Sequence, residues 1–292
     1  MGLDYPLKAL NFTVTLFKNR FQPGKLPLAF FMSIFLLACG EKIPTTSEIK
    51  EDNHQSRAAQ MLRIADTTRQ GGDLGSALAL YRRAHAMSPE EMTPLVAIAE
   101  TAFALGYFDQ AANAYDKAIG MAAQNTKVLL GYGKTLISMD LPDQAIKHFQ
   151  KAIEVNPADH RGYNGYGVSL DMLGRHTKAQ ELYHKGIEVA PEAVSLSNNL
   201  ALSLAFAGNY EMAIGILEVF ADDPLVGIRL RQNLALIYGL AGKEDKAAKI
   251  ASQYLDKAGI TNNLAYYRQL RELSSQARAQ AVFGTPKEQN PK

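Results

Sequence analysis

Residues 126–159 read TKVLLGYGKTLISMDLPDQAIKHFQKAIEVNPAD, and residues 160–193 read HRGYNGYGVSLDMLGRHTKAQELYHKGIEVAPEA. Placed one under the other without a gap, both segments have glycine at the eighth place, alanine at the twentieth, an aromatic residue at the twenty-fourth and proline at the thirty-second. This is a repeat of 34 residues. Its units begin near Ala58, Met92, Thr126, His160, Val194 and Ile228, so that six units occupy residues 58–261.

Two columns of the repeat hold only small residues. The eighth place is Ala65, Ala99, Gly133, Gly167, Ala201 and Ala235, and the twentieth is Ala77, Ala111, Ala145, Ala179, Ala213 and Ala247. Two antiparallel helices approach closely only where the side chains at their crossing are this small. Each unit is therefore predicted to be a pair of helices, with larger apolar residues filling the space beside the crossing.

Glycine and proline mark the helix ends. Glycine recurs where the first helix of a unit must stop in a left-handed conformation, at Gly72, Gly106, Gly174, Gly208 and Gly242. Asp140 stands at that place in the third unit. Pro89, Pro157 and Pro191 follow the second helices of their units, because proline cannot donate the next helical hydrogen bond. The sequence predicts an all-α protein.

In these columns the chain resembles tetratricopeptide-repeat (TPR) proteins. The resemblance implies that about six helix-turn-helix units stack into a right-handed superhelix with a concave groove, and that the last unit is covered by a C-terminal capping helix. Apolar residues at helical spacing after the sixth unit, including Leu264, Tyr267 and Leu270, predict that cap.

The front of the chain has the pattern of an export signal. Basic residues precede an uncharged apolar run from Leu26 to Gly40, which at 15 residues is shorter than the ~20 that a membrane-spanning helix needs. The run ends in Leu36-Leu37-Ala38-Cys39-Gly40, which resembles the bacterial lipobox and contains the only cysteine. That resemblance implies that Cys39 is the lipid attachment site, and Gly40, which follows it in place of aspartate, implies sorting to the outer membrane.

We divide the chain accordingly: residues 1–38 are a removed lipoprotein signal peptide, 39–57 the lipidated cysteine with a polar tether, 58–261 the six units, 262–282 the capping helix and 283–292 a disordered tail.

The chain also resembles the TadD family. The resemblance rests on the lipobox together with Asn199-Leu200-Ala201, Asn233-Leu234-Ala235 and Asn263-Leu264-Ala265. Members are TPR lipoproteins of the tight-adherence (Tad) system, which assembles Flp pili, and act with the outer-membrane secretin.

The sequence contains no motif that indicates catalysis or the binding of a metal or phosphate group. The six histidines lack the spacing of a helix-borne zinc hydrolase, and Gly162-Tyr163-Asn164-Gly165-Tyr166-Gly167 lacks the spacing of a phosphate-binding loop. Ser169 and Ser195 have no base positioned by any motif. With a net charge of +2 the chain carries no basic footprint for nucleic acid. We expect no enzymatic activity, cofactor, metal, small-molecule substrate or nucleic acid.

The predicted site is the groove. First helices should present the second, fifth, ninth, twelfth and thirteenth places of each unit to it. By this count the protein-binding residues are Lys127, Leu130, Lys134, Arg161, Asn164, Asp171, Asn198, Leu202, Phe206, Arg229, Gln232, Leu236 and Leu240. Such a wall suits an extended or helical peptide. A solvated face with the partner bound elsewhere is the alternative.

These observations predict a periplasm-facing scaffold, lipid-anchored in the outer membrane, that binds a protein partner, a pilus or secretin component, and assists its assembly. Two alternatives in the same class are another secretin pilotin and an adaptor for a cell-wall enzyme. A third, from another class, is a cytoplasmic regulator or catalytic accessory, which requires that the front of the chain is not processed.

Overall fold

The computed structural model describes residues 46–220 and 227–284, with side chains from Arg57 onward. Fourteen α-helices and no strand occur in this part of the chain. In five units the first helix begins at the residue expected from the repeat, as α3 (Met92–Ala104), α5 (Thr126–Ser138), α7 (His160–Met172), α9 (Val194–Phe206) and α11 (Ile228–Leu240). The predicted all-α fold is confirmed.

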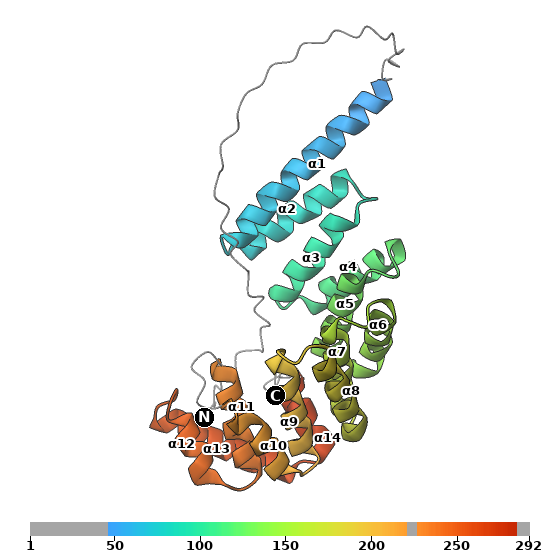
Figure 1. Ribbon diagram of the computed structural model, residues 1–292. Helices are drawn as coiled ribbons and strands as arrows, with labels where there is room; N and C mark the ends of the chain where they lie inside the picture. The colour runs from blue at the N-terminus through green and yellow to red at the C-terminus, as the bar shows by residue number, and fades with distance from the viewer. Residues whose placement is uncertain (1–45, 221–226, 285–292) are drawn as a thin grey trace, which may run out of the picture.

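The second helices keep the same interval. They are α2 (Leu74–Met87), α4 (Phe108–Met121), α6 (Pro142–Val155), α8 (His176–Val189), α10 (Tyr210–Glu218) and α12 (Glu244–Ala251). Within each unit the two helices pack against each other, and each second helix then packs on the first helix of the next unit. The chain thus forms a continuous stack that curves from α1 to α13 (Figure 1).

Small residues lie at the helix crossings, as the columns predict. All six alanines of the twentieth column are fully buried. A Cβ atom added at Gly133 would lie 2.7 Å from the ring of Phe149, and one added at Gly167 would lie 2.5 Å from the ring of Tyr183. Real Cβ contacts are never this short, so these glycines admit the aromatic rings of the second helices.

The turn inside each unit is left-handed. The five predicted glycines have φ between 73° and 90°, and Asp140 has φ of 60° at the same place in the third unit. The amide after the turn residue donates to a carbonyl in the last turn of the first helix, for example from Tyr107 to Ala102 at 2.8 Å. This is the hydrogen-bonded helix ending that glycine favours.

First helices form the inner layer of the curve. Besides their contacts within the stack, successive first helices touch one another directly, in the pairs α3–α5, α5–α7, α7–α9 and α9–α11. No comparable contact joins successive second helices of the described chain. Because the layer whose helices lie closer together is on the inside of a bend, the concave wall is built from first helices.

The structure differs from the expected boundaries at both ends. The first helix, α1 (Thr46–Gln70), begins twelve residues before Ala58 and takes in most of the expected tether. The cap is two helices, α13 (Lys257–Glu272) and α14 (Ser275–Phe283). The break has a local cause, because Leu273 is extended and the Ser274 side chain caps α14 by accepting a hydrogen bond from the amide of Ala277 at 3.2 Å.

The last helix folds back onto the stack. α14 packs against α7 and α9, more than a hundred residues earlier in the chain in the case of α7, and in Figure 1 it lies beside α9. α7 and α9 are first helices, so α14 lies on the inner layer. The cap therefore does more than cover the last unit.

Candidate functional site: the concave groove

The inner wall is defined here as the side chains at the second, fifth, ninth, twelfth and thirteenth places of the first helices. Its N-terminal part is charged and carries ion pairs between units. Glu100 on α3 accepts from Arg69 of α1 at 3.4 Å and from Lys127 of α5 at 2.7 Å. One carboxylate thus links three successive first helices. The predicted set contains Lys127 but not Arg69 or Glu100, which the same columns assign to the wall once they are applied to the first two units.

Lys134 is the second wall cation of α5. Its ammonium group lies 4.3 Å from the centre of the Phe103 ring, in a cation–π contact with the neighbouring first helix. Burial lowers the pKa of Lys134 to about 8, and Glu100 opposes that shift. Leu130, between the two lysines on the same helix, is buried. The wall residues of α5 therefore serve packing as well as charge.

A ladder of asparagine side chains crosses the next three first helices. Asn199 donates to Asn164 at 2.9 Å, Asn198 donates to Asn199 at 3.1 Å, and Asn233 donates to Asn198 at 2.8 Å. Asn198, Asn199 and Asn233 remain partly exposed. A primary amide has two donor hydrogens and two acceptor lone pairs, and the ladder uses only part of that capacity. It can therefore also bind the backbone of a peptide.

Asn164 and Asn198 belong to the predicted wall, whereas Asn199 and Asn233 occupy the sixth place, which the groove prediction left out. Asparagine at the sixth place of two successive units was the signal that could have found them. The structure brings the fifth and sixth places of neighbouring units together, because each first helix packs on the next.

Three exposed polar residues flank the ladder on the side where the first helices begin. Arg161 lies at the start of α7, and Arg229 and Gln232 lie in the first turns of α11. Arg161 makes two side-chain hydrogen bonds to Asp159, at 2.8 and 2.6 Å. These bonds raise the pKa of Arg161 and lower that of Asp159. Both arginines are exposed, and a guanidinium group is suited to bind a carboxylate.

Asp171 was predicted to line the groove, but the structure buries it completely. Its carboxylate contacts His176 Nδ1 at 2.8 Å and accepts from the hydroxyls of Tyr183 at 2.8 Å and Ser203 at 2.6 Å. Burial raises the pKa of Asp171, and hydrogen bonds from these three groups oppose the shift. This cluster joins α7, α8 and α9 and offers nothing to a partner at the surface.

The predicted apolar residues of the wall are likewise buried. Leu202, Phe206, Leu236 and Leu240 belong to one hydrophobic core that also includes residues of α13 and α14. Phe206, the last residue of α9, meets Phe283 of α14 edge to face, with ring centres 5.5 Å apart. The groove thus has a polar side that is open and an apolar side that is buried, partly against α14 on α7 and α9 and partly against α13 on α11.

Comparison with known proteins agrees with this architecture. Residues 102–165 match the profile described as tetratricopeptide repeat. A tetratricopeptide repeat protein from Parabacteroides merdae ATCC 43184 is similar in structure, with a TM-score of 0.62 and 21% identity over 72% of this chain and 84% of that one. The chain has the TPR fold.

Two other solved structures are similar in fold. PilW, described as a widely conserved type IV pilus biogenesis factor, aligns with a TM-score of 0.62 and 16% identity over 72% of this chain and 97% of its own. PilF of Pseudomonas aeruginosa aligns with a TM-score of 0.57 and 18% identity over 74% and 99%. No curated protein matches the chain.

The TPR fold is generally non-enzymatic. Among the described residues, Ser203, His176 and Asp171 form a cluster that could suggest hydrolysis, but its hydrogen bonds do not have the order that hydrolysis requires. The Ser203 hydroxyl donates to the Asp171 carboxylate, whereas a nucleophilic serine needs a base such as His176. All three side chains are buried.

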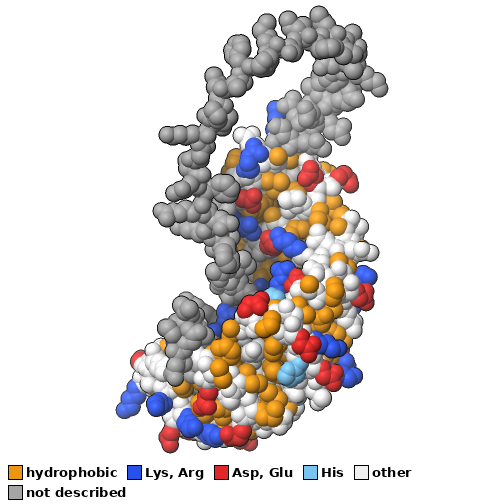
Figure 2. All heavy atoms as spheres, in the orientation of Figure 1, with side chains coloured by type: hydrophobic (Ala, Val, Ile, Leu, Met, Phe, Trp, Pro, Cys, Tyr) orange, Lys and Arg blue, Asp and Glu red, His pale blue; other side chains and the backbone are white. Residues whose placement is uncertain are grey.

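On the face seen in Figure 2, basic and acidic side chains are interspersed, with no patch of one sign.

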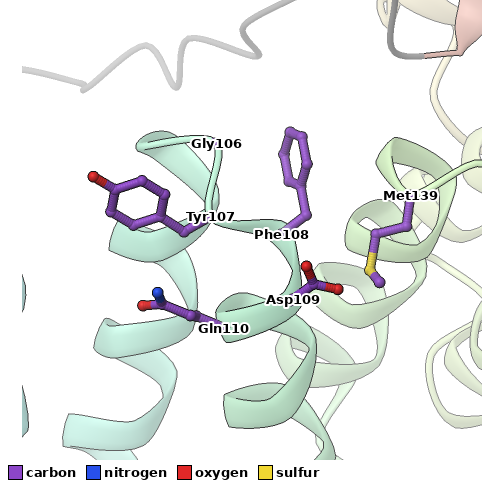
Figure 3. Close-up of a pocket in the computed structure, with 6 residues that line it drawn as sticks. All are labelled: Gly106, Tyr107, Phe108, Asp109, Gln110 and Met139. Atoms are coloured by element: carbon purple, nitrogen blue, oxygen red, sulfur yellow. The ribbon is translucent and has the colours of Figure 1, made fainter. Parts of the chain in front are cut away.

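A shallow hollow of about 500 Å³ lies at the turn between α3 and α4. Figure 3 shows its lining, with Asp109 at the start of α4 facing Met139 at the end of α5. Its one carboxylate has no positioned base, nucleophile or cation beside it among the lining residues. The hollow therefore gives no reason to move the candidate site from the groove.

The predicted signal peptide and Cys39 lie outside the described residues. Within residues 46–220 and 227–284, none of the helices combines the length and the apolar character that crossing a membrane requires. The tail from residue 285 onward also lies outside the described part.

Proposed function

We propose that this chain is a scaffold that binds a segment of a protein partner in its groove, and that it serves pilus or secretin assembly from a lipid anchor in the outer membrane. The asparagine ladder with its flanking arginines carries the binding part of the proposal. Likeness in fold to PilW, a type IV pilus biogenesis factor, supports the choice of pathway.

The ladder suits an extended peptide. Packed helices lie about 8 to 10 Å apart, and an extended chain advances about 3.3 Å per residue, so roughly three peptide residues span one unit. Side-chain amides of Asn198, Asn199 and Asn233 would pair with the peptide backbone, because an amide matches both its N–H and C=O groups. Arg161 and Arg229 would select acidic side chains or a terminal carboxylate.

The lipid anchor and the Tad pathway rest on sequence resemblance. Lipid on Cys39 would hold the TPR domain at a membrane, because two or three acyl chains make attachment effectively permanent. The TadD-like pattern favours the Flp pilus. Another secretin pilotin and an adaptor for a cell-wall enzyme use the same groove, and the partner captured would separate them.

Anchoring is tested by metabolic labelling with a fatty-acid analogue in cells expressing the full chain. We expect label on the wild type, recovered with outer-membrane fractions, and none on Cys39→Ser. An unlabelled wild-type chain recovered in the cytoplasm would favour the alternative of a cytoplasmic regulator.

Groove binding is tested by charge reversal. We expect Arg161→Glu and Arg229→Glu each to lower the yield of co-purified pilus or secretin component from detergent-solubilised envelopes at least tenfold, with thermal midpoints close to that of the wild type. Arg83→Glu, exposed on the outer helix α2, is the matched control and should capture normally. Normal capture by both groove variants would place the interface on another face.

A further inference from the structure

The C-terminal helix α14 occupies part of the groove. It lies over the last residues of α7 and α9, Met172 and Phe206, both of which are fully buried in its presence. Gln280 donates to the carbonyl of Met172 at 3.1 Å, and Phe283 packs on Phe206. The part of the apolar side at the ends of α7 and α9 is thus already occupied by a helix of the same chain.

One face of α14 makes this contact. Ala279 is fully buried, and Phe283 lies four residues later on the same face of the helix. Ala281 is exposed, whereas Gln276, although also exposed, lies beside Gly174 at the turn after α7, where an added Cβ atom would be 3.1 Å from that of Gln276. The surface of α7 and α9 therefore accepts a helix that presents a small residue followed by an aromatic residue at the fourth position after it.

Outside that face, α14 is held by hydrogen bonds of Arg278 and by its connection to α13. Arg278 donates to the carbonyls of Leu270 and Arg271, which belong to the adjoining helix α13. Its bond to the Tyr210 hydroxyl, at 3.3 Å, is one of the few to a side chain of the stack. A helix of nine residues is marginal in water by itself, so α14 folds as it docks and unfolds as it leaves.

We propose that the surface of α7 and α9 beneath α14 is a helix-binding site, that α14 is its resident occupant, and that a partner helix with the same small and aromatic spacing displaces it. The partner class rests on the proposed function. The helix-binding site itself does not, because it is tested on this chain alone.

The affinity of this site for a separate helix can be estimated, because α14 is covalently attached to the domain that it binds. A short connection gives α14 an effective concentration in the millimolar range. If α14 is docked at least ten times more often than it is free, the same helix added as a separate peptide should bind the vacated site with a Kd of about 0.1 mM or lower. In the wild type the resident helix competes, so the peptide should bind at least tenfold more weakly.

The experiment uses the full chain and a fluorescent peptide of residues 274–284, SSQARAQAVFG. Ala279→Glu places a charge in the buried contact and should release α14, whereas the matched control Ala281→Glu changes an exposed alanine of the same helix. Hydrogen exchange of residues 275–283 reports release. Should Ala279→Glu lower the stability of the whole domain, Phe283→Ala removes the ring contact more gently and serves in its place.

We expect fast exchange of α14 and peptide binding near 0.1 mM in Ala279→Glu, and wild-type behaviour in Ala281→Glu. A peptide with the phenylalanine replaced by alanine should bind at least tenfold more weakly. Release of α14 without peptide binding below 1 mM, no release in Ala279→Glu, or equal effects of both variants would overturn the proposal. This experiment contains no envelope component. Its failure would overturn the helix-binding site but would not decide whether Arg161 and Arg229 capture a partner, which the co-purification experiment tests.

Discussion

Positions 106 and 140 occupy the same place in successive units, yet one is glycine and the other aspartate. Both are left-handed, with φ of 79° at Gly106 and 60° at Asp140. A Cβ atom at position 106 would meet nothing within 4 Å, so replacing this glycine tests the backbone conformation alone. In this left-handed region the conformational energy of a residue other than glycine is higher by roughly 1 to 2 kcal/mol, and that of aspartate by less than most.

We therefore expect Gly106→Ala to lower the free energy of unfolding by about 1 kcal/mol, and Asp140→Gly to raise it by up to about 1 kcal/mol. Urea denaturation of the two variants beside the wild type measures both. Opposite signs are the decisive result. Destabilisation by both substitutions would show that Asp140 contributes more through its side chain than its backbone costs.

His148 on α6 connects stability to pH. Its ring packs on Tyr132 with centres 4.5 Å apart, and its Nε2 atom is buried without a hydrogen-bond partner. Burial and, to a lesser extent, Lys147 lower the pKa of His148 from 6.5 to about 4, while Asp116 opposes the shift. The unfolded chain therefore binds this proton more tightly than the folded chain. Stability from this group is full above pH 6.5 and is lost as the pH falls toward 4.

Replacing His148 by phenylalanine keeps an aromatic ring against Tyr132 and removes the titration. We expect the wild type to lose about 1 to 2 kcal/mol more than His148→Phe between pH 7 and pH 4.5, after allowance for partial exposure of the ring. Chemical denaturation at the two pH values measures the difference. Parallel losses in the two proteins would assign the acid sensitivity to other groups.

At the level of helices, the alanine columns make a direct prediction. Ala145 of α6 is fully buried at the crossing with α5, whereas Gln144 beside it is exposed. Ala145→Leu should lower the free energy of unfolding by roughly 1 to 3 kcal/mol, because added methylenes force packed helices apart. Gln144→Leu is the control with the same introduced side chain. Equal thermal midpoints for Ala145→Leu and the wild type would contradict the assigned register.

Helix boundaries were predictable where a residue type is required by the backbone or by a crossing. Gly106 and Gly174 end first helices, and the alanine columns set where helices cross. The start of α1 at Thr46 could not be predicted, because no apolar periodicity marks residues 46–57. The break before α14 depends on one capping serine, Ser274, which a continuous helical pattern conceals.

The sequence predicted which positions belong to the groove wall, but not whether the side chain at each position is exposed or buried. Arg161 and Arg229 are exposed on the wall, as the columns imply. Asp171 occupies a wall column too, yet the structure buries it against His176, whose column holds no recurring residue type. Its other partner Ser203 stands at the tenth place, which is threonine or serine in the first five units. Phe206 is hidden by a helix that belongs to no unit. Contacts between units obey the columns, whereas contacts with α14 depend on one nonrepeated segment.

Over the whole molecule, the hydrophobic core is divided into three clusters of unequal size. The largest joins α7 to α14, a second joins α1 to α5, and a small one in the third unit lies between them. The large buried residues of this small cluster are Leu129, Leu130, Leu136 and Phe149. In stacked repeats each unit is stabilised by itself and its neighbours only, so local stability should follow this division.

Hydrogen exchange should therefore be slowest in α9 and α11, and faster in α5 and α6 although these lie in the middle of the chain. Simple fraying of a uniform array predicts the reverse, with the most protected amides at the centre. Leu234→Ala, a fully buried site in α11, should cost about 2 to 5 kcal/mol locally and speed exchange in α9 and α11 while leaving α3 and α4 unchanged. Slower exchange in α5 than in α11 of the wild type would show that the third unit draws more stability from its neighbours than its own small core supplies.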